Sequence, residues 1–329
     1  MRRRWIRKLA LALASAVLGF VLVGEVALRL WNPPEVRLFD RPFQGAPGER
    51  VVKIDRRYEV HPEFGIFQVD DRLGYRPVPG GAGYGPHGAK WNEYAPEKAP
   101  GKRRLLFLGD SVTDRHKLID ALRESLGEDY EYWNAGIPGY ATEQEFLYYR
   151  DHLGEIAADH VLLTFHLNDY ETTPVVFESG GEFVAVHAKV GNAAPNAWLM
   201  RNSFLFRYAW MCLMRLTSAA RPAAIEAEVA RDLTALRELV RARGADFTVL
   251  VLPWIQDPAR WPDPKPRHYE LTLRTLDELG IRHFDFRATL ERALADGIQV
   301  HEMKDDPQHP SLELARRMVA DLLATGFRP

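Results

Sequence analysis

Short apolar runs alternate with longer amphipathic segments over the last two thirds of the chain. From Ile225 to Val240, apolar side chains recur at spacings of three and four residues until Gly244, and the pattern returns over 312–322, which predicts two helices. The short runs are rich in β-branched and aromatic residues, which favour strands. We predict strands at Leu105–Leu108, Tyr130–Trp133, Val161–Phe165, Phe247–Leu252 and His283–Phe286.

Strands that alternate with helices indicate an α/β fold, because parallel neighbours must be joined by crossover segments that are usually helical. We therefore predict a three-layer α/β/α sandwich with a parallel, doubly wound sheet. Ligands of such sheets bind beyond the carboxyl ends of the strands. Polar residues that directly follow a strand are consequently the first candidates for chemistry.

A basic tip and a long apolar run open the chain. Leu9–Gly24 carries no charge, and the apolar character continues past Glu25 and Arg29 to Trp31. A helix of this length is roughly 35 Å long, which is enough to cross a bilayer. A cleaved signal peptide begins in the same way, but the small residues that precede a cleavage site fit poorly here. We favour an uncleaved signal anchor over residues 1–31 and keep cleavage as the alternative.

The distribution of charge sets the orientation and narrows the partners. Basic residues at the cytoplasmic side predict a single-pass protein of the inner (cytoplasmic) membrane, with everything after Trp31 on the periplasmic or extracellular side. The rest of the chain has 38 basic and 45 acidic side chains, which argues against nucleic acid as a partner. Cys212 is the only cysteine, which excludes an intrachain disulfide and a multi-cysteine metal site. The basic tip consists of Arg2, Arg3, Arg4, Arg7 and Lys8.

Residues 32–101 differ in composition from the rest of the chain. Ten of the 22 prolines and nine of the 24 glycines fall between residues 32 and 100, and this composition blocks long helices. We predict a linker and an irregular lead-in on the surface of a domain formed by residues 102–329.

Two later segments have more than one interpretation. Phe204–Leu216 is an apolar and aromatic helix that packs in a core, faces a membrane or binds an acyl chain. Phe177–Val186, with two glycines in its middle, is typical of a hairpin. That hairpin either covers a site as a lid or lies at an edge of the fold.

A serine follows the first predicted strand, in the triplet Gly109-Asp110-Ser111. Its hydroxyl is expected at a turn between strand and helix, on the ligand edge of the sheet. The nucleophile elbow of the α/β-hydrolases is excluded, because it requires a glycine two residues after the serine. A serine nucleophile needs a base, a group that orients the base, and N–H donors for the oxyanion.

Three further segments supply those groups. Asp306 and His309 precede the last amphipathic helix, and a spacing of three lets one turn present both side chains to the same side. The carboxylate can then hold the imidazole in the tautomer that accepts a proton from a hydroxyl. Asn134–Gly139 and His166–Asp169 follow the second and third strands and offer donors, although such residues also favour ordinary turns.

These four segments resemble the sequence blocks of the SGNH (GDSL-type) hydrolases. The resemblance covers about Arg103–Thr325 and implies the flavodoxin-like fold of that family, with no metal and no organic cofactor. By this similarity Ser111 is the nucleophile, His309 the general base and Asp306 its orienting carboxylate. The implied oxyanion hole consists of the backbone N–H groups of Ser111 and Gly139 and the side-chain amide of Asn168.

One position departs from the family pattern. The family usually has glycine two residues before the asparagine of its third block, and here that position is His166. We expect a bulky ring there to narrow the pocket. Asp110, His166 and Asp169 are therefore candidate pocket residues.

The resemblance and the predicted anchor together indicate a serine esterase. The expected substrate is an acyl ester, above all an O-acetyl ester, of an extracytoplasmic carbohydrate or glycan. Transfer to a sugar hydroxyl of an exopolysaccharide or envelope glycan would make the protein an O-acetyltransferase instead. A lipid or thioester hydrolase is a further alternative, as is a scaffold in an envelope polysaccharide-modification complex. The intact triad argues against the scaffold.

Overall fold

The computed structural model describes residues 2–37, 51–54, 67–70, 72–80, 83–90, 94–170, 173–179, 182–186, 190, 193, 195–217, 221–304 and 306–329. The chain forms two compact units. Unit 1 comprises Met1–Asp55 and Pro174–Pro222, and unit 2 comprises Arg56–Thr173 and Ala223–Pro329. The predicted division at residues 31 and 101 is a different one, because residues 174–222 form a unit with the N-terminal residues.

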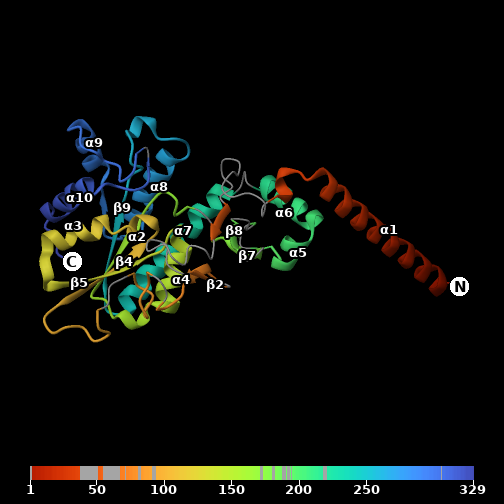
Figure 1. Ribbon diagram of the computed structural model, residues 1–329, viewed down its shortest axis with the longest axis horizontal. Helices are drawn as coiled ribbons and strands as arrows, with labels where there is room; N and C mark the ends of the chain where they lie inside the picture. The colour runs from red at the N-terminus through yellow and green to blue at the C-terminus, as the bar shows by residue number, and fades with distance from the viewer. Residues whose placement is uncertain are drawn as a thin grey trace. The chain divides into compact units, whose positions relative to one another are not determined.

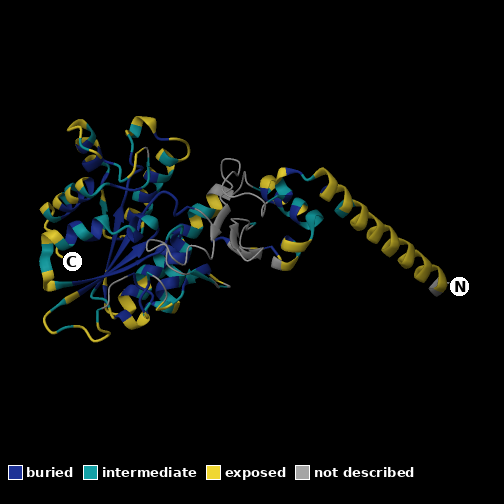
Figure 2. Cartoon of the chain, in the orientation of Figure 1, coloured by how far each residue is buried: buried dark blue, intermediate teal, exposed yellow. Residues whose placement is uncertain are grey.

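Unit 2 is built on a five-stranded parallel sheet with the strand order β10-β9-β6-β4-β5 (Figure 1). All five predicted strands are present close to their predicted bounds, and the sheet is the most buried part of the unit (Figure 2). This confirms the predicted α/β fold. The strands are β4 (Arg103–Gly109), β5 (Tyr130–Gly136), β6 (His160–Phe165), β9 (Asp246–Val251) and β10 (His283–Asp285).

Helices cover both faces of this sheet, as parallel crossovers require. On one face, Leu105 and Phe107 of β4 share a core with α3, α9 and α10. Helices α4 and α7 lie on the opposite face (Figure 1), and α8 joins β9 to β10. The two helices predicted from the apolar spacing correspond to α7 and α10. The bounds are α3 (Lys117–Leu126), α4 (Thr142–His152), α7 (Arg221–Ala242), α8 (Lys265–Glu278), α9 (Arg287–Ala295) and α10 (Leu312–Ala324).

Of the predicted linker and lead-in, the described residues from 67 onward belong to unit 2, whereas 32–37 and 51–54 belong to unit 1. Strands β2 (Phe67–Asp70) and β3 (Gly74–Pro77) form an antiparallel pair. Tyr75, Tyr84 and Lys90 are each at most 3% exposed. The segment therefore contributes buried side chains, while residues 38–50 and 55–66 of the predicted linker lie outside the described residues. Short 3-10 turns complete the unit at η3 (Gly127–Asp129), η4 (Gly154–Ile156) and η6 (Pro258–Arg260).

Unit 1 contains the N-terminal helix and a small sheet. The predicted hairpin is present as antiparallel β7 and β8, and β1 adds a third antiparallel strand beside β8. Gly180 and Gly181, in the predicted turn, lie outside the described residues. The predicted apolar helix is present as α6. The elements are α1 (Arg2–Trp31), η1 (Pro34–Val36), β1 (Val51–Ile54), β7 (Val175–Ser179), β8 (Glu182–Val186), α5 (Ala197–Asn202) and α6 (Phe204–Thr217).

Helix α1 is exposed along almost its whole length (Figure 2). Among the described residues, Arg4–Trp31 is the one stretch that is long and apolar enough to cross a membrane. A signal sequence at the same position has these properties too. The structure therefore agrees with a membrane-crossing helix or a signal sequence, which are the two alternatives that the sequence predicted.

Candidate active site

Ser111 lies at the carboxyl end of β4, as predicted. It begins the short helix α2 (Ser111–Asp114), and the Asp110 carboxylate caps this helix by accepting a hydrogen bond from Val112 N at 2.8 Å. Gly109 has φ of +151°, and a Cβ atom there would lie 2.1 Å from Thr113 Oγ1. Only glycine fits this tight turn, which presents the half-buried Ser111 at the edge of the sheet.

The Asp306–His309 turn lies next to Ser111 in space. His309 Nδ1 is 2.6 Å from Asp306 Oδ2, and His309 Nε2 is 2.8 Å from Ser111 Oγ. The predicted spacing of three therefore brings the carboxylate and the imidazole together, and the chain places both beside the serine. The Asp306 carboxylate, the His309 imidazole and the Ser111 hydroxyl form one continuous hydrogen-bonded relay.

Backbone hydrogen bonds fasten the loop that carries this relay. Ile255 N, just after β9, donates to Pro307 O at 2.8 Å. Glu302 N donates to His309 O at 3.0 Å, on the other side of the loop. Ser311 then caps α10. The loop is thus held to the carboxyl edge of the sheet before the last helix begins.

Hydrogen bonding determines the charge of Asp306. Burial acts to raise the pKa of Asp306, but hydrogen bonds from the backbone N–H of Gln308 and from His309 outweigh burial and lower that pKa. The carboxylate is therefore ionised near neutral pH. It accepts a hydrogen bond from the Nδ1–H group of His309, which leaves Nε2 free to accept the hydroxyl proton of Ser111.

Asn168 is held from two sides at the end of β6. Its Nδ2 donates to Asp110 Oδ2 at 2.7 Å, and its Oδ1 lies 2.7 Å from His166 Nδ1. An amide oxygen can only accept, so His166 Nδ1 must carry the proton. Burial lowers the pKa of His166 to about 4, which keeps the ring neutral. The ring also stacks on Trp254, with centroids 5.7 Å apart.

The three candidate pocket residues support Asn168 and its turn. Asp110, His166 and Asp169 are at most 1% exposed, so none presents its surface to an open pocket. Asp169 Oδ2 accepts a hydrogen bond from His166 N at 2.7 Å and closes the turn. The His166 ring is fully buried beside Trp254 and is hydrogen-bonded to Asn168, and the expected narrowing of a pocket by this ring stays a prediction.

The turn after β5 is fixed by the lead-in segment. Gly139 has φ of +78°, and a Cβ atom there would lie 2.8 Å from Tyr75 Oη. The Tyr75 hydroxyl donates to Pro138 O, and the Tyr140 hydroxyl donates to Tyr75 O at 2.6 Å. Strand β3 thus sets the orientation of the Pro138–Gly139 peptide, and with it the Gly139 N–H.

Asn134 has a supporting place in the structure. Its Nδ2 donates to Thr113 O at 2.9 Å, and its Oδ1 accepts from Gly136 N at 2.8 Å. The side chain therefore ties the end of β5 to helix α2.

Sequence reasoning missed two buried ionisable groups beneath the site. Burial, followed by the charge of Asp110, raises the pKa of Glu145 well above its usual value. Neither carboxyl oxygen of Glu145 has a partner among the described residues. Lys90 pairs with Asp114 of α2 at 2.5 Å. Nothing in the sequence marked either residue, since Glu145 fits the polar pattern of α4 and Lys90 ends a glycine-rich stretch.

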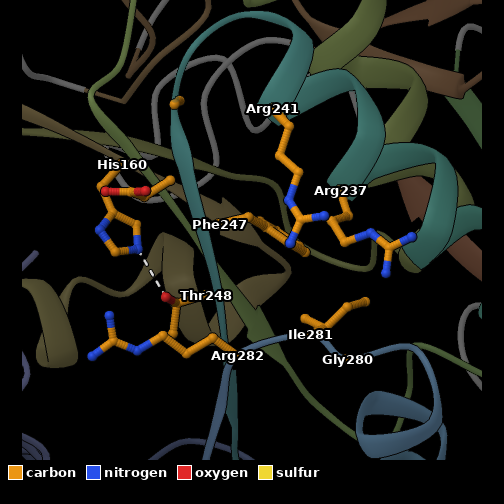
Figure 3. Close-up of a pocket in the computed structure, with 10 residues that line it drawn as sticks. His160, Arg237, Arg241, Phe247, Thr248, Gly280, Ile281 and Arg282 are labelled. Atoms are coloured by element: carbon orange, nitrogen blue, oxygen red, sulfur yellow. Dashed lines mark hydrogen bonds between the residues drawn. The ribbon is translucent and has the colours of Figure 1, made fainter.

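A separate pocket of about 260 Å³ lies at the opposite edge of the sheet, where β6 and β9 begin (Figure 3). His160 lies there, and its Nε2 is 2.8 Å from Thr248 Oγ1. Burial lowers the pKa of His160 to about 4. No residue of the Ser111 site lines this pocket, whose basic side chains are Arg237, Arg241 and Arg282.

No protein-family model matches this chain, and no curated protein matches it. The structure is similar to an acetylxylan esterase from Geobacillus stearothermophilus, with 16% identity, a TM-score of 0.44, and coverage of 69% of this chain and 96% of that one. It is also similar to an α/β hydrolase enzyme from the metagenome of Lake Arreo, with 17% identity, a TM-score of 0.44, and coverage of 70% and 97%. A GDSL-like lipase from Bacteroides thetaiotaomicron gives 15% identity, a TM-score of 0.41, and coverage of 71% and 93%.

Proposed function

We propose that this chain is a serine ester hydrolase of the SGNH type. One observation carries the proposal: the relay from Asp306 through His309 to Ser111, with hydrogen-bond distances of 2.6 and 2.8 Å. The three residues lie in the order that nucleophilic catalysis by serine requires. Ser111 is the nucleophile, His309 the general base and Asp306 the carboxylate that orients it.

The reaction has two halves. In the first, Ser111 Oγ forms a bond to the ester carbonyl carbon as His309 Nε2 takes the hydroxyl proton. The tetrahedral intermediate collapses, the carbon–oxygen bond to the alcohol breaks, and His309 returns its proton to the departing alcohol. In the second half, His309 removes a proton from water, the resulting hydroxide attacks the acyl-serine, and the acid is released as Ser111 regains its proton.

The oxyanion of each tetrahedral intermediate needs donors already in place. We assign this role to the backbone N–H groups of Ser111 and Gly139 and to the Asn168 amide. One N–H of that amide is committed to Asp110, which leaves the second for the oxyanion. His166 and Asp110 together hold the amide plane, so the Asn168 N–H needs little reorientation when negative charge develops on the carbonyl oxygen.

The expected substrate is an O-acetyl ester of an extracytoplasmic carbohydrate or glycan. The support is topological: α1 begins with a basic tip, and by the positive-inside rule the chain after Trp31 then lies outside the cytoplasm. An anchored esterase that faces outward meets the esters of the cell envelope. Retention of α1 as an anchor, rather than its cleavage, belongs to this proposal.

The proposal is tested by hydrolysis of p-nitrophenyl esters by the purified full-length protein in detergent. We expect wild type to hydrolyse the acetyl ester faster than long-chain esters, and Ser111→Ala to lose activity while it remains folded. A preference for long acyl chains would favour a lipid or thioester substrate. Equal activity of wild type and Ser111→Ala would rule out Ser111 as the nucleophile.

Hydrolysis and transfer differ only in the second acceptor. The same assay is therefore repeated with an acceptor oligosaccharide, and the sugar is analysed by mass spectrometry for added acetyl groups. Acetylated sugar formed by wild type and not by Ser111→Ala would identify an O-acetyltransferase. Free acetate without acetylated sugar is the result that an esterase gives.

A further inference from the structure

Helix α6 exposes an apolar stripe that no described part of the chain covers. Its inner face holds the buried residues Arg207, Met211 and Met214. The opposite face exposes Ala209, Leu213 and Leu216, at spacings of four and three residues. Leu213 is 44% exposed and Leu216 is 81% exposed. Large apolar side chains gathered on one face of a helix mark an interaction surface.

The adjoining helix α5 also exposes a large aromatic side chain. Its Trp198 is 69% exposed, and α5 and α6 are separated only by Ser203. Tryptophan is enriched where hydrocarbon meets the polar headgroups of a bilayer. We call the exposed residues Trp198, Ala209, Leu213 and Leu216 the α5–α6 stripe.

The charged side chains of α6 are turned inward or paired. Arg207 donates to the carbonyl oxygens of Met200 and Arg201 at 2.8 and 3.0 Å, and also to that of Val36. Arg215 pairs with Glu35 of η1. Arg215 is itself exposed, but its charge is paired within unit 1, and the face with Ala209, Leu213 and Leu216 consists of apolar side chains. Such an arrangement suits contact with lipid.

Glu25 ties α6 to a fixed height on α1. Its carboxylate accepts hydrogen bonds from Ser203 Oγ, Phe204 N and Leu205 N at 2.9 to 3.0 Å, and so caps the first turn of α6. Arg29 bonds to Glu25 and lies 4.6 Å above the Phe204 ring. The start of α6 therefore cannot move along α1 without breaking these bonds.

The length of α1 shows how deep in a bilayer the start of α6 would lie. Glu25 lies about 25 Å along the helix axis from Lys8, the last residue of the basic tip. The hydrocarbon core of a bilayer is about 30 Å thick. With Lys8 at the inner boundary of this core, Glu25 lies about 5 Å short of the outer boundary and Trp31 lies about 5 Å beyond it. The Trp31 ring is 6.0 Å from that of Tyr208 in α6, so α6 lies at the boundary between hydrocarbon and headgroups on the outer side.

We propose that the α5–α6 stripe lies in the outer headgroup boundary of the membrane and contacts lipid directly. The partner is the bilayer itself, and the proposal rests on α1 crossing that bilayer. Unit 1 then has two membrane contacts, one helix that crosses and one that lies at the surface. This inference is independent of the ester chemistry, because no residue of the Ser111 relay belongs to unit 1.

The test uses the full-length protein in vesicles of phosphatidylethanolamine and phosphatidylglycerol. Cys212 is the only cysteine, so Cys212→Ser gives a background free of thiols. Nitroxide labels are placed through Leu213→Cys or Leu216→Cys, one at a time. Val17→Cys in α1 serves as the lipid reference and Glu291→Cys, exposed in α9, as the aqueous reference. Collision rates are measured with oxygen, which concentrates in lipid, and with a water-soluble nickel chelate.

We expect labels at positions 213 and 216 to collide more with oxygen than with nickel, as the label at position 17 does. A nickel-accessible label, like that at position 291, would place the stripe in water and overturn the proposal. Exclusion of both reagents would mean that protein, either a second copy or another chain, covers the stripe, and would overturn it too. An aqueous label at position 17 would remove the premise, while leaving the esterase assignment untouched.

Discussion

Each edge of the central sheet in unit 2 carries a buried histidine, and the two differ in their partners. At the carboxyl edge, His309 has a partner for both ring nitrogens, Asp306 on one side and Ser111 on the other. At the amino edge, His160 contacts Thr248 through Nε2, and its Nδ1 has no partner among the described residues. Burial is similar, with His309 9% and His160 1% exposed.

The difference bears on the proposed role of His309 as the general base. A buried imidazole with no hydrogen-bonded carboxylate resists protonation, and burial lowers the pKa of His160 to about 4. His309 has an ionised carboxylate on Nδ1, which stabilises the imidazolium that forms when Nε2 takes a proton. The carboxylate partner, more than the ring or its burial, separates the two edges.

The largest effect is expected for Asp306→Asn. Asparagine keeps the shape of the side chain but donates to Nδ1, which turns His309 into the tautomer with a proton on Nε2 and no free acceptor for the hydroxyl. We predict a loss of about 10⁴-fold in kcat for p-nitrophenyl acetate, with the fold retained by circular dichroism. A loss below about tenfold would show that Asp306 does not orient the base.

Asn168→Ala comes next. Removing one oxyanion donor is expected to lower kcat by about 10²- to 10³-fold, because the interaction strengthens only when charge develops on the carbonyl oxygen. KM should change much less than kcat. Asn134→Ala is the matched comparison, since Asn134 bonds to backbone groups beneath the site. Loss of kcat in Asn134→Ala alone would reverse the assignment.

His166→Gly restores the residue that the SGNH family usually has. It removes the hydrogen bond that holds Asn168 Oδ1, a contact worth about 1 kcal/mol, so we predict a decrease in kcat of about fivefold at unchanged KM. His166→Asn, which again offers a donor, should recover part of the loss. If KM rises while kcat is unchanged, His166 contacts substrate and does not act through Asn168.

The smallest effect on catalysis is expected at the amino edge. His160→Gln should leave the rate of ester hydrolysis within about twofold, because His160 belongs to the pocket of Figure 3 and lies apart from the relay. The His160→Gln substitution should instead change the free energy of unfolding. The pKa of His160 is about 4 when folded and 6.5 when unfolded, so between these values the unfolded chain binds the extra proton.

The free energy of unfolding therefore falls as the pH falls through that window. The slope contributed by one such histidine is about 1.4 kcal/mol per pH unit, and His160→Gln should remove it. Urea unfolding at pH 4.5, 5.5 and 6.5 measures the slope. Buried His166 should retain its own contribution in the variant. An unchanged slope in His160→Gln would show that this histidine is not held neutral by the fold.

Most of the frame of unit 2 was predictable from the sequence. The five strands have local apolar patterns, and a parallel sheet brings their carboxyl ends to one edge, which is why Ser111 and Asn168 were found together. Asp306 and His309 were found because their spacing is local. The fold class and the order of these segments therefore follow from short-range patterns and general topology.

The remaining features depend on contacts between distant segments. Tyr75 fixes the turn at Gly139, and Lys90 pairs beneath α2, although both lie in a stretch whose prolines and glycines indicated only a lead-in. Strand β1 pairs with β8 across some 130 residues of sequence. The orientation of the His166 ring follows from Trp254 and Asn168, which the sequence does not place beside it.

Covalent trapping is the sharpest test of Ser111 as a nucleophile that His309 activates. The full-length protein is treated with a fluorophosphonate, digested, and its peptides are mapped by mass spectrometry. The account predicts a phosphonyl group on Ser111 in wild type and in His160→Gln, and strongly slowed labelling in His309→Ala. Labelling at another residue, or none on the folded wild-type protein, would contradict it.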